Sequence, residues 1–277
     1  MKRNLKFYLK DKLNEKELLL VPTSFDVVGD IMIFSDFPKE LAKKEKMIAG
    51  VILENYRSIK TILKKTKKYS GKFRTPTLKI IGGERRKETV AKENDITIKL
   101  NVEKVYFSTR ISNERKRIAS LVKPNESVLV MFSGSGVYPL VIAKHSKCRE
   151  VYGIEINPTG HKYGLENVEK NKMNGRVKLF VGDVNKVLPK IKQKFDRVLM
   201  PLPKSAEEYL EIALKYTKKK GMIHFYDFLH EGEFELANEK IAAACKKTGR
   251  KFKIIRTVKC GQHSPGFFRI CVDFEVW

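Results

Sequence analysis

Apolar residues recur along the first part of this chain at spacings that change between those of strands and of helices. Two β-rich runs within residues 16–35 flank a turn at Gly29–Asp30. Residues 38–70 change to the spacing of a helix, which is expected to begin at Pro38. Residues 76–106 return to alternating apolar and polar positions, as strands do. We therefore expect a small α+β domain over this part of the chain.

The remainder of the chain alternates regularly between strand and helix patterns. The strands are short, apolar and β-branched, which indicates a parallel sheet covered by helices on both faces. The last two strands, KFKIIRTVKC and FFRICVDFEVW, have no helix between them and are expected to pair as an antiparallel hairpin. That ending is typical of class I methyltransferases. The prediction is a Rossmann-like, doubly wound α/β domain over residues 106–277, preceded by the α+β domain over residues 1–105.

A glycine-rich turn follows the first strand of this second domain, between Met131 and Tyr138. Glycines at such a crossover let a ligand approach the N-terminus of the next helix. Glu155 ends the next strand, where a carboxylate accepts hydrogen bonds from ribose hydroxyls, and Asp183 follows the third strand. The turn has Pro139 where dinucleotide-binding proteins have their third glycine, and no phosphate-binding GKS/T is present. S-adenosylmethionine is therefore the expected cofactor.

Two prolines, Pro201 and Pro203, make a rigid turn at the tip of the fourth strand, in the sequence MPLPKS. In enzymes that methylate amino groups this tip lies beside the methyl group and holds the target nitrogen. The alternative is a turn that only ends the strand. Because the tip comes after the third strand and before the fifth, the functional interpretation is favoured.

The net charge of the chain indicates the class of its binding partner. Lys and Arg total 57 against 32 Asp and Glu, a net charge of +25. Such a surface attracts polyanions, and nucleic acid is the expected partner rather than a membrane. A basic run from Arg57 to Lys72, with no acidic residue between Glu54 and Glu84, is either a track for phosphates or a solvated helix face.

Other features narrow the class of protein. No apolar run is long enough to span a membrane, and the N-terminus lacks the features of a signal peptide. The four cysteines are widely separated, so neither disulfides nor a metal site is expected. A cytoplasmic protein, in the form of a monomer, is the expectation.

Five segments follow one another along this chain in the order VYFSTRISNERKRIASLV, MFSGSG, IEINP, GDV and MPLPKSA. That order resembles the archaeal and eukaryotic type of tRNA (guanine-N1)-methyltransferase, which acts on guanosine 37 beside the anticodon. The resemblance covers roughly residues 15–277. It implies tRNA, held by its anticodon stem-loop, as the substrate.

The resemblance also implies roles for individual residues. Glu114 corresponds to the family's proposed general base, and Tyr106 to an aromatic residue near the target base. Arg110 and Arg115 correspond to arginines at the mouth of the active site, and Arg74 to one that contacts the guanine. The candidate catalytic residues are Glu114, Tyr106, Arg110, Arg74, Pro201 and Pro203. The candidate cofactor-binding residues are Arg115, Phe132, Ser133, Gly134, Gly136, Glu155, Ile156, Asp183, Val184 and Pro201.

The chain departs from the family pattern at three places. Met131 and the residues before it lack the usual Asp of the first strand, and Pro201 replaces the usual Asn of the fourth-strand tip. The chain also starts almost at the family's middle domain. A branch of the family methylates a tricyclic wyosine intermediate at the same nucleotide, and Pro201 makes that substrate a second expectation. Two further alternatives are an aminocarboxypropyl transferase of wybutosine synthesis and a non-catalytic RNA-binding relative.

Overall fold

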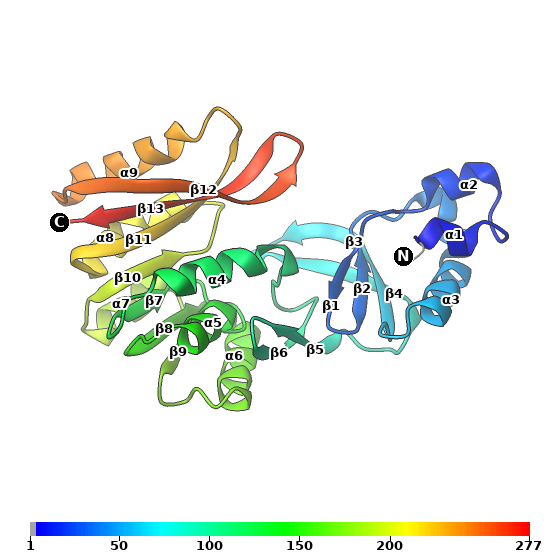
Figure 1. Cartoon of the computed structure of the whole chain (residues 1–277), viewed down its shortest axis with the longest axis horizontal. Helices are drawn as coiled ribbons and strands as arrows, with labels where there is room; N and C mark the ends of the chain where they lie inside the picture. Colours follow the sequence, from blue (N-terminus) through cyan, green and yellow to red (C-terminus); the bar gives the residue numbers. More distant parts are fainter. Residues whose placement is uncertain (1–3) are drawn as a thin grey trace. The chain divides into compact units, whose positions relative to one another are not determined.

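The computed structural model describes residues 4–277, and the side chains of residues 68–70 are not described. Two compact units make up the chain. The first consists of residues 1–92 and 97–109, and the second of residues 93–96 and 110–277 (Figure 1).

The first unit is built on a four-stranded sheet in the order β1-β2-β3-β4. Its strands are β1 (Asp26–Val28), β2 (Ile31–Phe34), β3 (Thr61–Ser70) and β4 (Thr75–Gly83). Its helices are α1 (Leu5–Leu9), α2 (Glu15–Leu20), the 3-10 helix η1 (Lys39–Lys44) and α3 (Glu45–Asn55). The core lies between these helices and the sheet, where Phe34, Ile48, Ile52 and Ile62 are fully buried.

Two of the expected elements of this unit are wrong. The helix expected over residues 38–70 ends at Asn55, and residues 61–70 form β3 instead. β3 lies between β2 and β4, so Thr61, Ile62 and Leu63 are buried on both faces of the sheet. Ile59 and Ile62 fitted a helical spacing by coincidence, because a strand buried on both faces has no clear period. Likewise residues 15–20 form α2, which begins with a capping box at Asn14 and Glu17, rather than a strand.

A separate two-stranded sheet pairs β5 (Glu88–Glu93) with β6 (Ile96–Asn101). Asn94 and Asp95 turn between them with φ angles of 44° and 57°, the left-handed conformation that a two-residue hairpin loop needs. The tip of this hairpin, residues 93–96, groups with the second unit, and the rest with the first.

The second unit is a seven-stranded sheet in the order β12-β13-β11-β10-β7-β8-β9. Its strands are β7 (Ser127–Val130), β8 (Glu150–Glu155), β9 (Val177–Val181), β10 (Phe195–Met200), β11 (Thr217–His230), β12 (Phe252–Ser264) and β13 (Phe267–Val276). Its helices are η2 (Thr109–Ile111), α4 (Ser112–Leu121), α5 (Val137–His145), α6 (Pro158–Lys170), α7 (Val184–Ile191), η3 (Ala206–Tyr209), α8 (Leu210–Tyr216) and α9 (Glu235–Thr248).

Five strands of this sheet are parallel, and β13 is antiparallel to both β11 and β12. This is the predicted Rossmann-like sheet with its antiparallel C-terminal hairpin, and the fold class is confirmed. The sequence of residues 205–220 predicts a single helix, and this prediction is wrong from residue 217 onward, because α8 ends at Tyr216 and β11 begins at Thr217. Thr217 is fully buried and pairs with Phe195, which takes the chain into the sheet four residues early.

Candidate cofactor and base site

The glycine-rich turn lies between β7 and α5, at the carboxyl edge of the parallel strands. Gly134 and Gly136 adopt φ angles of 56° and 81°, which L residues other than glycine rarely hold. Gly136 is the N-cap of α5, so the helix begins directly at the turn. The amide of Ser133 donates to the carbonyl of Ile154, at 2.9 Å, and fixes the turn against β8.

Helix α6 supports the turn from one side with small residues. A Cβ on Gly160 would lie 3.5 Å from the carbonyl oxygen of Gly134, and one on Gly164 would lie 2.7 Å from Leu179. One turn further along, the buried Asn167 amide donates to the carbonyl of Ser135 at 3.0 Å. The spacing of these three residues places them on one helix face, which therefore holds the turn in shape.

Glu155 lies beside this turn at the end of β8. Its carboxylate accepts hydrogen bonds from the amides of Gly134, at 2.6 Å, and Asn157, at 2.8 Å. Burial raises the pKa of Glu155, against the effect of these backbone hydrogen bonds. Ile156 follows it, half-buried. A carboxylate held in this way at a crossover is suited to accept hydrogen bonds from vicinal hydroxyls.

Asp183 and Val184 stand at the end of the third parallel strand. Asp183 is the N-cap of α7 and accepts from the amide of Asn185 at 2.8 Å, while Val184 is buried in the core. Gly182 donates to the carbonyl of Glu155, at 2.9 Å, so the ends of β8 and β9 lie together. The helix-capping role gives Asp183 a structural function of its own.

The turn contains polar atoms that fit a bound ligand. The hydroxyls of Ser133 and Ser135 are buried without a hydrogen-bond partner. Buried hydroxyls in folded proteins normally have partners, so two orphans in one turn indicate groups that a ligand or water completes. With the positive-φ glycines and the Glu155 carboxylate, they suit a nucleoside cofactor.

The tip of the fourth parallel strand is the turn that holds Pro201 and Pro203. Both prolines are half-buried, and the amide of Leu202 donates to the carbonyl of Met200 at 2.7 Å. Ser205 has a φ angle of 59° and begins η3. Phe132 of the glycine-rich turn contacts Tyr209 edge to face, with ring centroids 5.0 Å apart, so the two turns are joined.

Glu114 lies in the first turn of α4 and is 5% exposed. The hydroxyl of Tyr226 donates to its Oε1 at 2.7 Å, and Arg117 binds both of its oxygens, at 2.6 and 2.7 Å. Tyr138 in turn donates to the hydroxyl of Tyr226 at 3.2 Å. Burial raises the pKa of both phenols, so they remain donors at neutral pH. Glu114 is thus an oriented carboxylate, not only a residue that complements the helix dipole.

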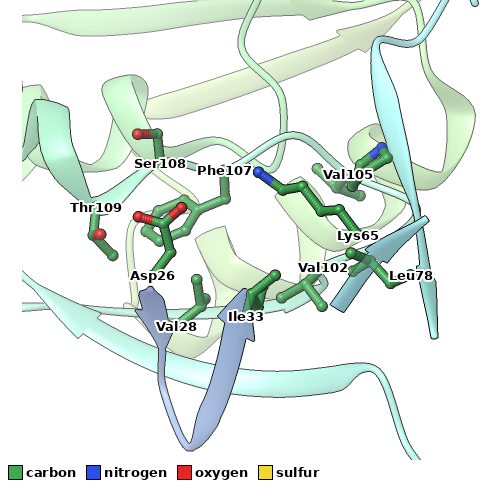
Figure 2. Close-up of a pocket in the computed structure, with 11 residues that line it drawn as sticks. Asp26, Val28, Ile33, Lys65, Leu78, Val102, Val105, Phe107, Ser108 and Thr109 are labelled. Carbon is green, nitrogen blue, oxygen red and sulfur yellow. The ribbon is translucent and has the colours of Figure 1, made fainter. Parts of the chain in front are cut away.

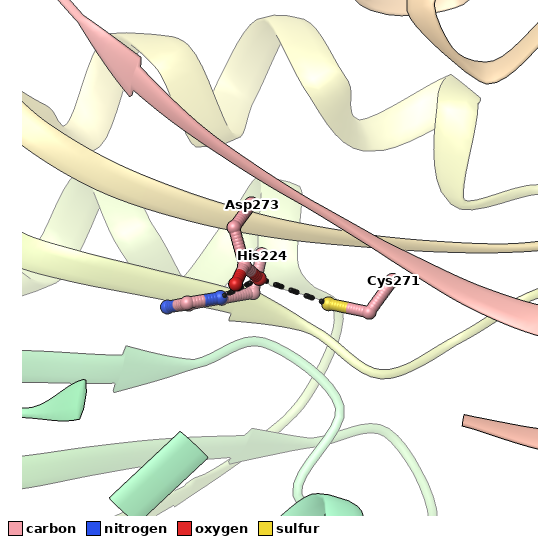
Figure 3. A group of neighbouring side chains, drawn as sticks. All are labelled: His224, Cys271 and Asp273. Carbon is pink, nitrogen blue, oxygen red and sulfur yellow. Dashed lines mark hydrogen bonds and ion pairs between the residues drawn. The ribbon is translucent and has the colours of Figure 1, made fainter. Parts of the chain in front are cut away.

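The network continues from Arg117 into the sheet. Arg117 also donates to Asp273, at 2.6 Å. His224 Nδ1 lies 2.6 Å from the same carboxylate (Figure 3). Arg197 faces His224 Nε2 at 2.7 Å. Since arginine can only donate, Nε2 is the acceptor and Nδ1–H donates to Asp273, which makes His224 the neutral tautomer.

Two pKa shifts describe this buried group. Burial lowers the pKa of His224, in spite of its hydrogen bond to Asp273. Burial by itself would raise the pKa of Asp273, but the hydrogen bonds from His224 and Arg117 lower it well below its usual range. Both pKa values are thus lowered, which agrees with a neutral imidazole beside an ionised carboxylate, and we assign the charge balance of Asp273 to Arg117 and Arg256.

Cys271 lies beside this pair, so three residues have the spacing of metal ligands (Figure 3). The Cys271 thiol donates to Asp273 at 3.3 Å. The guanidinium groups of Arg117 and Arg256 bind the same carboxylate, and positive charge already surrounds it. Protein groups therefore satisfy this cluster without a metal ion.

The two predicted arginines near Glu114 differ in their surroundings. Arg115 is 3% exposed and binds Glu93 with two hydrogen bonds of 2.5 Å, and its guanidinium lies 5.8 Å from the Tyr138 ring centroid. It joins α4 to the tip of the β5–β6 hairpin. Arg110, in η2, is exposed.

Tyr106 and Arg74 belong to the first unit. Tyr106 is 38% exposed, and Arg74 ends the turn between β3 and β4 with a φ angle of 49°. Phe107 lines a pocket of this unit together with Asp26 and Lys65 (Figure 2). Its volume of about 40 Å³ holds a few water molecules rather than a nucleobase.

Sequence reasoning missed the partners of Glu114. Tyr226, which binds Glu114, and Asp273, which binds Arg117, come from β11 and β13, more than a hundred residues from Glu114 along the chain. Tyr226 lies two residues from His224 on β11, and Asp273 lies two residues from Cys271 on β13, so each pair shares a face of its strand. Nothing in the sequence shows which helix covers that face.

Comparison with known families decides the class of protein. Residues 89–255 match the TRM5/TYW2 methyltransferase domain. The chain belongs to the TRM5/TYW2 methyltransferase family. Residues 5–86 of this TRM5/TYW2 protein match the TYW2 N-terminal domain as well. The predicted family resemblance and the predicted enzyme class, a methyltransferase that uses S-adenosylmethionine, are confirmed at this level.

Several curated proteins are similar over most of their length. The tRNA (guanine(37)-N(1))-methyltransferase Trm5b of Pyrococcus abyssi is 37% identical, over 92% of this chain and 76% of its own. The tRNA (guanine(37)-N(1))/4-demethylwyosine(37)-methyltransferase Taw22 of Nanoarchaeum equitans is 35% identical, over 76% and 86%. A tRNA(Phe) (4-demethylwyosine(37)-C(7)) aminocarboxypropyltransferase of Methanocaldococcus jannaschii is 32% identical, over 90% and 96%.

Solved structures show the same fold. The crystal structure of Trm5b from Pyrococcus abyssi has a TM-score of 0.87 and 35% identity, with 100% of this chain and 81% of that chain covered. A complex of aTrm5 with tRNALeu has a TM-score of 0.85 and 26% identity, over 99% and 78%. Pyrococcus horikoshii TYW2 in complex with MeSAdo has a TM-score of 0.83 and 27% identity, over 99% and 98%. Within residues 4–277 of this TRM5/TYW2 protein, no helix is long and apolar enough to cross a membrane.

Proposed function

We propose that this chain transfers the methyl group of S-adenosylmethionine to N1 of guanosine 37 in tRNA. The observation that carries the proposal is the oriented Glu114 carboxylate, which belongs to the same unit as the glycine-rich turn and the Pro201 tip. Relatives named for this reaction are 29–37% identical.

The cofactor would be held by the glycine-rich turn, Glu155, Ile156 and the Asp183–Val184 pair, with Phe132 and Pro201 beside it. Glu155 would accept from the ribose hydroxyls, and the orphan hydroxyls of Ser133 and Ser135 fit a polar ligand. When bound, S-adenosylmethionine supplies an electrophilic methyl group. Arg115, buried against Glu93, would support this site through α4 rather than by direct contact.

Glu114 would accept the N1 proton of guanine as the methyl group is transferred. A well-placed general base contributes roughly a hundred- to ten-thousandfold to the rate. Tyr226 and Arg117 orient the carboxylate, and Arg110 or Arg74 would balance charge developing on the guanine O6. Tyr106 would stack on the target base, and the turn of Pro201 and Pro203 would position it.

The proposal assigns RNA binding to residues 1–105 and catalysis to residues 106–277. It includes recognition of the anticodon stem-loop by a monomeric, cytoplasmic enzyme that needs no metal ion. Size-exclusion chromatography would test the monomer, and activity in the presence of a chelator would test the absence of a metal requirement.

Specific observations favour two alternative reactions. Pro201 stands where the family usually has Asn, which is compatible with a tricyclic wyosine precursor in place of plain guanosine. The match of residues 5–86 to the TYW2 N-terminal domain supports aminocarboxypropyl transfer.

One experiment separates these reactions. The protein is incubated with tRNA that carries guanosine or 4-demethylwyosine at position 37 and with S-adenosylmethionine. The cofactor is labelled in either its methyl or its carboxyl carbon. Methyl transfer moves only the methyl label to the RNA, and nucleoside mass mapping then locates it at N1 of guanosine 37. Transfer of the carboxyl label would replace the proposal with the aminocarboxypropyl reaction. No label transfer to either RNA would support a non-catalytic relative.

A further inference from the structure

Three strands of the second unit run beyond the rest of their sheet. β10 pairs with β11 only as far as Met200 and Phe225, while β11 continues to His230 and β13 pairs with it as far as Phe267 (Figure 1). β11 is parallel to β10, so this extension lies past the carboxyl ends of the strands. That edge also carries the glycine-rich turn and the Pro201 tip, and ligands of such sheets bind there.

One face of the extension carries a cluster of rings, consisting of Phe228, His230, His263 and Phe267. Phe228 and Phe267 are stacked, with centroids 5.8 Å apart and planes 27° apart. His263 lies 4.8 Å from Phe228, and His230 lies 4.7 Å from Phe267. The guanidinium of Arg269 lies 5.1 Å from the centroid of Phe228 and adds a cation to this ring cluster.

The ring cluster is on the same strand face as Tyr226, which binds Glu114. Side chains alternate along a strand, so Tyr226, Phe228 and His230 of β11 point to one side. Tyr226 holds Glu114, and Phe228 follows about 7 Å further along the strand. The rings therefore continue outward from the carboxylate that the proposed function makes the base.

The two faces of the extension differ in what covers them. On the opposite face Leu229 is buried, and Phe268 packs against the core and Phe234. On the ring-cluster face His230 and His263 are exposed. Two imidazoles and a guanidinium around two phenyl rings offer flat surfaces and positive charge together, which is the chemistry that stacks unpaired nucleobases.

We propose that the ring cluster is a stacking site for an unpaired base of the RNA substrate, next to the base that is modified. It rests on the proposed function, because that function brings a nucleotide to Glu114. A base adjoining the target would then reach the extension, and its stacking would offset part of the cost of taking the target base out of its own stack. The net charge of +25 favours RNA, a polyanion, over an uncharged apolar ligand as the occupant.

The test uses the full chain and tRNA transcripts with 2-aminopurine on either side of guanosine 37. Binding to the unchanged protein should quench the fluorescence of one of the two probes. His263→Ala and Phe267→Ala should remove that quenching and weaken tRNA binding about fivefold or more. Since stacking releases no counterions, the slope of log affinity against log salt should stay the same. Phe267→Tyr keeps a ring and should bind as the unchanged protein does.

Ile255→Ala is the matched control, since Ile255 is 47% exposed on β12 and outside the ring cluster. His263 is exposed, so its substitution tests the site even if Phe267→Ala fails to fold. Wild-type quenching and affinity in His263→Ala would overturn the inference. So would a weakened variant whose salt slope falls, because the contact would then be to phosphate. If the unchanged protein modifies no tRNA at all, the proposed function fails first, and that result is distinguishable from both.

Discussion

The hydroxyl of Tyr226 donates to the carboxylate of Glu114 at 2.7 Å, although Tyr226 lies 112 residues further along the chain. Arg117, which also lies in α4, donates hydrogen bonds to the same carboxylate and to Asp273. Glu114 is therefore fixed from two directions, by a neutral donor and by a charged one. A carboxylate held in this way keeps one orientation, as a residue that acts on a substrate requires.

Substitution of Glu114 by Gln should leave the shape of the site but remove the proton acceptor. Methylation in a single turnover should fall roughly a hundredfold or more, with tRNA and cofactor affinity nearly unchanged. Higher pH should partly rescue the variant, because guanine N1 then ionises without help. Rapid-quench assays across pH measure both effects.

Asp227→Asn is the matched control, because it breaks another buried ion pair, with Lys240 of α9, that has no proposed role in the site. Both variants should lose thermal stability. A Glu114→Gln variant that folds correctly and methylates at the wild-type rate would show that Glu114 only stabilises α4.

Substitution of Glu155 by Ala should weaken S-adenosylmethionine binding. The expected loss is about 1.5–3 kcal/mol, the usual range for hydrogen bonds to a charged group. Calorimetry with the purified protein measures it. Asp183→Asn keeps a side chain that can cap α7, so it is expected to alter folding little and serves as a comparison. Equal affinity in wild type and Glu155→Ala would move the ribose contact to another residue.

The basic run contributes exposed charges from one strand and its flanks. Lys60, Lys67 and Lys72 are exposed, whereas Lys64 is paired with Glu45 at 2.5 Å. Changing the three exposed lysines to Gln should weaken tRNA binding and lower the salt slope by up to about one unit per lost phosphate contact.

Lys219→Gln with Lys220→Gln is the control, because these exposed lysines lie near the amino end of β11, away from the site edge. Filter-binding titrations over a range of salt concentrations give both slopes. An unaltered slope in the triple variant would make the basic run a solvated surface.

The buried His224 should make stability depend on pH. Its folded pKa is lowered by burial from the ordinary value of 6.5. Below that value the unfolded chain takes up a proton that the folded chain does not, so the free energy of unfolding should decrease as the pH falls below about 6.5. Asp273, whose pKa is also lowered, adds a further loss at more acidic pH.

Thermal melting of wild type and His224→Gln between neutral and mildly acidic pH checks this. The variant should be less stable at neutral pH, because it disturbs Asp273 and Arg197, but its stability should change less over the same interval. Parallel curves for the two proteins would assign the dependence to other groups.

The sequence by itself determined the architecture of the second unit. Strands of apolar β-branched residues alternate with helices there, and each crossover ends in a polar or glycine residue at the same edge. Such local patterns suffice because parallel strands bring their carboxyl ends together. Gly134, Glu155 and Asp183 were found on this basis, and the structure places all three at one edge.

The tertiary structure alone decided which residues surround Glu114. Tyr226, Asp273 and His224 are ordinary strand residues until β11 and β13 pair and α4 covers their face. Buried polar groups select partners by proximity in space, and no local spacing encodes that proximity. The same reason explains β3, where the spacing of apolar residues such as Ile62 fitted a helix. Only the position of β3 between β2 and β4, which buries Ile62 and Leu63, showed that it is a strand.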